Sequence, residues 1–331
     1  MAEDVDSEFM NRAIALAWRG CGHTRPNPPV GAVIVKNGKI VGEGWHRRAG
    51  GDHAEVAAIK NALPHSPTPP LPHSTTPSLL HSSTLYVTLE PCSKPGRVGA
   101  CTDAIIKAGI PKVIYAVPDP NPKNRGRAKR ILAKAGIKCE RLAAGDCVNA
   151  AQRLIAPFAK HVTTGLPYVT VKIAMSLDGK ICDSSGDAKW ISSETARRET
   201  GRIRERVDAI MVGGETVRKD NPSLLSHGRR NDDLIRVIVS KSGRLPKKAQ
   251  VFADGAPNKT LVFNDAKTAL VELGKMGVMH VLCEGGLNLA TSLAEAGLVD
   301  EWIIVLAPKV IGTRRIGKAT RIGRVECLQD W

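Results

Sequence analysis

The sequence has few aromatic residues and no long hydrophobic run. Aromatic residues make up 4% of the 331 positions, which leaves few side chains for stacking on nucleic-acid bases. No stretch approaches the roughly 18 uninterrupted apolar residues that a membrane-spanning helix needs. The first twelve residues are acidic and polar, without the apolar segment of a signal peptide. We therefore expect a cytoplasmic chain with no membrane partner.

Cysteine is also scarce for a chain of this length. The 8 cysteines are scattered between Cys21 and Cys327, too sparsely for a domain held together by disulfides, so we expect buried thiols or metal ligands. The length corresponds to about two domains of roughly 150 residues each. An apolar content of 42% is enough to build two ordinary cores. The composition thus predicts a globular chain of two domains.

What the sequence does have is a large positive charge, +16 at pH 7. Clustered Lys and Arg can neutralise the phosphates of nucleic acids. Here the charge is spread out, and its denser parts, 123–130 and 197–206, fall where helices are expected. Three interpretations stay open: solvated basic faces, binding of a phosphorylated small molecule, and binding of nucleic acid. The spread and the shortage of aromatics favour the first two, so we expect no nucleic-acid partner.

The first half of the chain alternates between helical and strand patterns. Ser7 is expected to cap a helix, and Asn37-Gly38 is a strong hairpin turn between strands at 30–35 and 39–42. Residues 64–83 are rich in Pro, Ser and Thr and predict a flexible surface insert. Further elements are expected as a helix at 54–62, a strand at 84–88, a helix at 100–108 and a strand at 113–117.

The second half repeats the alternation, which predicts a largely parallel sheet covered by helices on both faces. We place the boundary near residue 150, with a first domain at 1–147, a linking helix at 148–164 and a second domain at 165–331. Strands are expected at 168–174, 209–212, 236–240, 260–263, 278–283 and 302–307, and helices at 194–206 and 287–296.

One group of residues has the chemistry of a catalytic zinc site. His53, Cys92 and Cys101 offer one imidazole and two thiolates, which are three good zinc ligands that leave a fourth position for water. Glu55 lies two residues from His53 and is predicted to move protons between the water and a departing amine. The alternative is that the two thiols are merely buried and that His53 caps a helix.

The ordered set of motifs resembles the bifunctional riboflavin deaminase-reductase family. In the first half the resemblance rests on 26–31, 42–46, 53–55, 89–101 and 119–122. Eight residues separate Cys92 from Cys101, as in this family, whereas transfer-RNA and cytidine deaminases typically have two. The resemblance implies an α/β fold: a cytidine-deaminase-like α/β/α domain followed by a dihydrofolate-reductase-like α/β domain.

For the first domain, the resemblance implies zinc-dependent deamination of 2,5-diamino-6-ribosylamino-4(3H)-pyrimidinone 5′-phosphate. Asn27, His46 and Arg97 match family positions that contact this substrate. The family commonly forms dimers or larger assemblies, so a homo-oligomer is expected.

For the second domain, the resemblance rests on 175–180, 189–192, 213–217 and 284–286, and implies NADPH-dependent reduction of the ribosyl group to a ribityl chain. No G-x-G-x-x-G follows its first strand, so the cofactor is implied mainly by the resemblance. The positions implied to face NADPH are Ala174, Trp190, Thr216, Asp220, Ser240, Gly286, Leu287, Asn288, Leu289, Ala290, Thr291 and Ser292. Those implied to face the substrate are Ala188, Arg204, Leu224, His227 and Glu284, with Lys172 and Asp220 as candidates for proton transfer.

Three alternatives remain at this point. Ala188, Asn221 and His227 depart from the usual residues of the family, and the tail after residue 312 is short, which would suit an active deaminase joined to a weakened reductase. The basic charge and the zinc chemistry would also suit a nucleic-acid-editing deaminase. The third alternative is a non-catalytic protein that has kept the fold.

Overall fold

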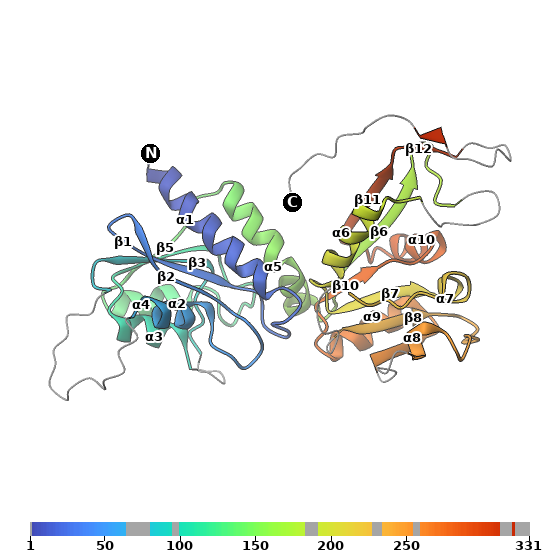
Figure 1. Ribbon diagram of the computed structural model, residues 1–331. Coiled ribbons are helices and arrows are strands. Elements are labelled where there is room, and N and C mark those ends of the chain that lie inside the picture. The colour runs from blue at the N-terminus through green and yellow to red at the C-terminus, as the bar shows by residue number, and fades with distance from the viewer. Residues whose placement is uncertain are drawn as a thin grey trace. The chain divides into compact units, whose positions relative to one another are not determined.

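A computed structural model of the chain describes residues 2–63, 80–94, 99–182, 191–226, 234–253, 259–311 and 320–321 (Figure 1). The chain forms two compact units, Met1–Leu166 and Pro167–Trp331. The second unit begins within two residues of the domain expected at 165–331, but the helix expected as a link at 148–164 belongs to the first unit. The reason is that helix α5 (Asp146–Thr164) buries Val148, Ala151 and Ile155 in the core of the first unit.

The first unit contains a five-stranded sheet in the order β2-β1-β3-β4-β5. The strands β1 and β2 form the expected antiparallel hairpin, and β3, β4 and β5 run parallel to one another. Parallel neighbours bring their carboxyl ends to the same edge of the sheet, where side chains from separate loops can meet. The strands are β1 (Gly31–Lys36), β2 (Lys39–Trp45), β3 (Ser83–Leu89), β4 (Lys112–Val117) and β5 (Lys138–Arg141).

Helices cover both faces of this sheet (Figure 1). Successive residues of a strand point to opposite faces, so Val33 packs against α1 and α5 while Ala32 and Ile34 pack against the other helices. This gives the α/β/α layering that the alternating pattern predicts. The helices are α1 (Ala2–Ala17), the short 3-10 turn η1 (Trp18–Gly20), α2 (Ala54–Ala62), α3 (Cys101–Ala108), α4 (Arg127–Lys134) and α5.

Two local expectations for the first unit are wrong. Ser7 does not cap the first helix, because α1 already begins at Ala2 and Ser7 lies inside it. The insert expected at 64–83 does not extend to its last residues: Leu80 is 1% exposed in the core, and Ser83 begins β3. Residues 64–79 of that insert lie outside the described part.

The second unit contains a six-stranded sheet in the order β11-β6-β10-β7-β8-β9. Every neighbouring pair in it is parallel, as the alternation of strands and helices predicts. The strands are β6 (Tyr168–Ser176), β7 (Ala209–Gly213), β8 (Ile235–Val239), β9 (Thr260–Phe263), β10 (His280–Cys283) and β11 (Glu301–Ala307), and the short β12 (Lys309–Val310) and β13 (Thr320–Arg321) pair separately.

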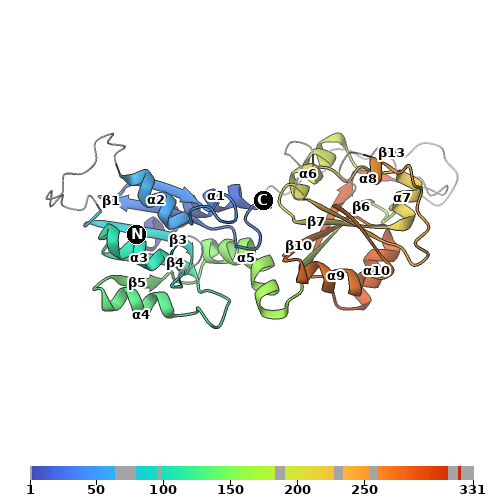
Figure 2. The same ribbon diagram turned by 90° about the horizontal axis from the view of Figure 1, so that it is seen from below.

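Each face of the second sheet has its own apolar core. Figure 2 shows α9 and α10 on one face and α6, α7 and α8 on the other. The α/β class expected for both halves is thereby confirmed. Among the helices of the described residues, none has the length and apolar character to cross a membrane. The helices are α6 (Glu194–Arg204), α7 (Gly214–Asp220), α8 (Gln250–Ala253), α9 (Ala266–Lys275) and α10 (Leu287–Glu295).

Candidate functional site

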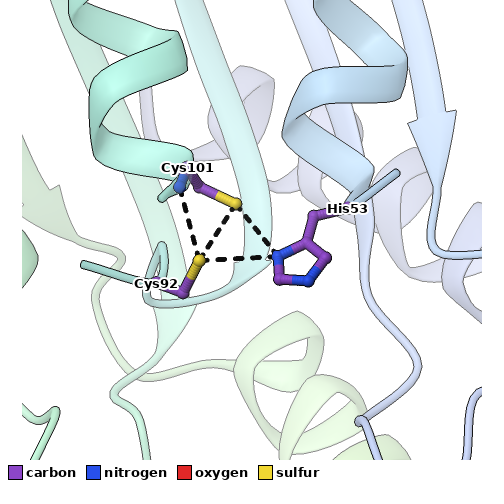
Figure 3. Close-up of side chains that lie close together, drawn as sticks. All are labelled: His53, Cys92 and Cys101. Atoms are coloured by element: carbon purple, nitrogen blue, oxygen red, sulfur yellow. Dashed lines mark hydrogen bonds between the residues drawn. The ribbon is translucent and has the colours of Figure 1, made fainter. Parts of the chain in front are cut away.

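The three predicted metal ligands come from three different segments and converge (Figure 3). His53 occupies the N-cap position of α2, Cys92 lies in the loop after β3, and Cys101 is the first residue of α3. The His53 ring makes no capping hydrogen bond to α2 and instead faces the two sulfurs. The alternative of a helix-capping histidine beside unrelated thiols is therefore wrong.

The spacing of the donor atoms suits a tetrahedral zinc ion. His53 Nδ1 lies 3.2 Å from Cys101 Sγ and 3.4 Å from Cys92 Sγ, and the two sulfurs are 3.3 Å apart. Zinc bonds of about 2.0–2.1 Å to nitrogen and about 2.3 Å to sulfur require donor separations of roughly 3.5–3.8 Å. The three side chains reach those separations by moving a few tenths of an ångström, so the residues fit the metal.

The electrostatics of the site favour a thiolate at Cys92. Its sulfur lies 3.3 Å from the Cys101 sulfur and accepts a hydrogen bond from the Cys101 backbone amide, also at 3.3 Å. These contacts, together with His53, lower the pKa of Cys92 to about 4. A thiolate is the form of cysteine that binds zinc. The surroundings of Cys92 thus favour the deprotonated form that a zinc ligand needs.

Glu55 is positioned beside these ligands by the first turn of α2. Its side chain is only 3% exposed. Burial, followed by the negative charge at Cys92, raises the pKa of Glu55 to about 7. A carboxyl group with a pKa near neutrality can both accept and release a proton. This is the behaviour expected of the acid-base residue predicted at this position.

Asn27 and His46, two predicted substrate contacts, also meet next to the metal ligands. His46 Nδ1 donates to the backbone oxygen of Asp52 at 2.9 Å, and its Nε2 lies 3.1 Å from Asn27 Nδ2. Burial lowers the pKa of His46, which favours a neutral ring that accepts from the Asn27 amide. The His46 and His53 rings pack edge to face at 5.2 Å. Arg97, the third predicted contact, lies outside the described residues.

Helix α2 approaches the sheet so closely that only glycine fits beneath it, a feature that the sequence analysis missed. A Cβ atom at Gly44 on β2 would lie 2.3 Å from the Ala58 amide nitrogen and 2.4 Å from the Ala54 carbonyl oxygen. Such a contact is impossible without movement of the helix backbone. Gly44 therefore allows α2, with His53 at its N-cap and Glu55 in its first turn, to pack this closely against the sheet. In the sequence, the one sign of this close packing is the pair Gly42 and Gly44, which lie against successive turns of α2.

In the second unit, three predicted residues form one charged cluster. Arg204 and Glu284 make a bidentate ion pair, with Nε to Oε1 at 2.6 Å and Nη2 to Oε2 at 2.9 Å. Both side chains are largely buried. Burial lowers the pKa of Lys172, a shift that the nearby Glu284 opposes. Lys172, Arg204 and Glu284 thus lie near one another even though they are distant in sequence.

Other predicted reductase positions are divided between the surface and the core. Gly286 is the exposed N-cap of α10, whereas Leu289 and Ala290 are buried against the sheet. Leu224 is 2% exposed and packs in the core, which leaves its backbone as the part able to contact a ligand.

The remaining cofactor positions lie on β6 or on the segments that follow β7, β8 and β10. Ala174 is on β6, Thr216 and Asp220 are on α7, Ser240 follows β8, and Leu287, Asn288, Thr291 and Ser292 are exposed on α10. Ala188, Trp190 and His227 lie outside the described residues.

Two family models match this chain, one for each unit. Residues 3–117 match the cytidine and deoxycytidylate deaminase zinc-binding region. Residues 167–322 match the RibD C-terminal domain. The first match contains His53, Cys92 and Cys101, and the second contains Lys172, Arg204 and Glu284. The two chemistries expected from the sequence thus fall in separate domains.

Similarity to known proteins extends over nearly the whole chain. The riboflavin biosynthesis protein RibD of Aquifex aeolicus is 35% identical, over 94% of this chain and 89% of that protein. The structure of Acinetobacter baumannii RibD is 36% identical with a TM-score of 0.81, covering 94% of this chain and 89% of that one. A Thermotoga maritima diaminohydroxyphosphoribosylaminopyrimidine deaminase/5-amino-6-(5-phosphoribosylamino)uracil reductase is 33% identical with a TM-score of 0.82, covering 95% of this chain and 89% of that one. The chain therefore belongs to the RibD family of riboflavin biosynthesis proteins, in which a zinc-binding deaminase domain is joined to a reductase domain.

Proposed function

We propose that the deaminase half hydrolyses 2,5-diamino-6-ribosylamino-4(3H)-pyrimidinone 5′-phosphate through His53, Cys92, Cys101 and Glu55. The observation that carries this assignment is the convergence of one imidazole and two thiols beside a buried carboxyl group. Water replaces the ring amino group, which leaves as ammonia, so one C–O bond forms and one C–N bond breaks. Family membership supports the pyrimidine nucleotide as the substrate over a nucleic acid.

Each residue of the deaminase half has a distinct task in this proposal. His53, Cys92 and Cys101 would hold a zinc ion, which when bound would supply an activated water as the nucleophile. Glu55 takes a proton from that water and delivers it to the departing amine, for which a pKa of about 7 is well suited. His46 holds the Asn27 amide nitrogen and so leaves the Asn27 carbonyl oxygen available to the substrate.

In the reductase half, bound NADPH would supply the hydride that reduces C1′ of the ribosylamino group. The N-terminus of α10, with Gly286 as its N-cap, would hold the cofactor phosphates through backbone amides at the positive end of the helix. The ribose ring opens when its oxygen takes a proton, and burial lowers the pKa of Lys172 against the opposing negative charge of Glu284. We assign Lys172 as the proton donor. The ion pair of Glu284 and Arg204 positions the groups around it.

A two-step assay with purified zinc-loaded protein tests these assignments. Ammonia release from the pyrimidine nucleotide and NADPH consumption with the deaminated product are measured separately. Removal of zinc by a chelator is expected to stop the first reaction and to leave the second unchanged. Deamination of a transfer-RNA anticodon stem in place of the nucleotide would refute the substrate assignment, and absence of NADPH consumption would favour the alternative of a weakened reductase.

We also propose that the chain self-associates through the edge strand β11. Trp302, Ile304 and Leu306 form a row along one side of this strand and are 45%, 53% and 53% exposed. An exposed apolar row on a sheet edge is typical of an interaction surface. A second copy of the chain presents the same row, so a two-fold contact would cover both at once.

A further inference from the structure

One buried carboxylate in the deaminase unit has no part in the chemistry described so far. Glu90 lies between β3 and the ligand Cys92, and its side chain is 3% exposed. Its Oε2 accepts hydrogen bonds from the amides of Asp119 at 3.3 Å and Gly126 at 3.0 Å, and its Oε1 accepts one from Ala128 at 3.3 Å. Burying a carboxylate is costly unless it is well satisfied, so this arrangement needs an explanation.

Two of the amides, those of Asp119 and Gly126, belong to the connection from β4 to α4, and the third, that of Ala128, lies in the first turn of α4. Gly126 is the N-cap residue of α4 and has no capping side chain of its own. Glu90 therefore caps this helix from the loop after β3 and places a negative charge at its positive end. The same carboxylate binds Asp119, whose own side chain is 7% exposed and accepts from the Asn121 amide at 2.8 Å. Glu90 thus holds both ends of segment 119–126.

This segment leaves the sheet next to the metal ligands. The Glu90 amide donates to the Val117 oxygen at 2.8 Å, so the loops that follow the parallel strands β3 and β4 start side by side. One of these loops carries Cys92 two residues later, and the other is segment 119–126. Ligand sites of α/β sheets form from such loops at the carboxyl ends of strands.

We propose that Glu90 is a positioning residue that holds segment 119–126 against the Cys92 loop, so that the segment forms one wall of the pyrimidine pocket. This inference rests on the proposed deaminase function. It explains why a carboxylate is used: both oxygens accept, and three donors face them. A glutamine of the same shape would present its NH₂ group to an amide N–H and leave that donor unsatisfied.

The test compares Glu90→Gln with Glu140→Gln, an exposed carboxylate on β5 that pairs with Lys138 at 2.9 Å. In Glu90→Gln the KM for the pyrimidine nucleotide should rise roughly tenfold, with kcat changed less than about threefold and zinc retained. Amide hydrogen exchange of the zinc-loaded full chain should become faster within 119–128 alone. Glu140→Gln should match the unmodified protein in all of these measurements.

A second variant changes the donor of the same hydrogen bond, Gly126, instead of the acceptor Glu90. Gly126 has a φ of 74°, which an alanine adopts only with strain, so Gly126→Ala should displace the donor and raise KM in the same way. This variant decides the matter if Glu90→Gln does not fold. An unchanged KM, unchanged exchange in 119–128 or a loss of zinc would overturn the inference. If the unmodified chain shows no deamination, the proposed function fails and this inference fails with it.

Discussion

At the residue scale, the deaminase centre depends on an acid that is not a metal ligand. In the proposed mechanism Glu55 moves protons while His53, Cys92 and Cys101 hold zinc, so we expect Glu55→Gln to lower kcat for ammonia release by about 10²–10⁴ with zinc still bound. Ammonia release and metal content measured on the same preparation check this. Cys92→Ser is the contrasting variant, since it should lose the metal as well. Loss of stoichiometric zinc from Glu55→Gln would contradict the role of this residue.

One histidine in the reductase unit, His280, is expected to make stability depend on pH. His280 Nε2 lies 2.8 Å from Thr170 Oγ1, and the ring packs edge to face on Tyr168 at 5.5 Å. Burial lowers the pKa of His280 from 6.5 to about 4. The folded state therefore keeps the ring neutral, whereas the unfolded state takes up a proton as the pH falls below 6.5.

The free energy of unfolding should be at its full value above pH 6.5 and fall by up to about 1.4 kcal/mol per pH unit toward pH 4. Denaturant unfolding of this unit, measured across that range, gives the slope. In His280→Gln, which keeps a polar side chain but cannot titrate, this part of the slope should disappear. Identical slopes in the two proteins would show that His280 is not the group responsible.

At the element scale, the close packing of α2 against β2 decides whether the zinc ligands meet. Ala54 and Ala58 of α2 approach the backbone of Gly44 to distances that exclude a methyl group. Since α2 starts directly after His53 and carries Glu55, a displaced helix would move a zinc ligand and the acid-base residue together.

We expect Gly44→Ala to lower the free energy of unfolding by about 1–3 kcal/mol through overpacking. The affinity for zinc should fall roughly tenfold, because the ligand His53 moves away from the sulfurs. Competition with a zinc chelator measures the affinity. Gly145→Ala is the matched control, since a Cβ atom there meets nothing within 4 Å. Wild-type zinc affinity in Gly44→Ala would rule out this role for the close packing.

At the scale of the whole molecule, the two edges of the second sheet differ. The edge strand β11 exposes three large apolar side chains in a row, whereas β9 at the opposite edge exposes Val262 at 43%. A charge placed in an apolar interface is costly, so Ile304→Lys should convert the assembled protein to monomers. Sedimentation or light scattering reports the mass, and Val262→Lys is the control of similar exposure. A monomeric unmodified chain would already disprove the proposed interface.

Much of the site was predictable because its chemistry lies in short, continuous motifs. The zinc ligands and Glu55 stand within recognisable strings, and strand alternation predicted both sheets. The elements α7, α9 and β5 were not predicted, and neither was the burial of Leu80 beside a low-complexity segment. In these cases tertiary packing overrides weak local signals.

The sequence by itself determined which atoms are available: one imidazole, two thiols and a carboxyl group at fixed spacings, with apolar residues in the periods of strands and helices. Only the tertiary structure decided that the imidazole nitrogen and the two sulfurs lie 3.2–3.4 Å from one another, that Glu55 is buried beside them, and that Arg204 pairs with Glu284 at a separation of 80 residues. The physical reason is that residue chemistry is local, whereas distance, burial and pKa depend on segments that meet only when the chain folds.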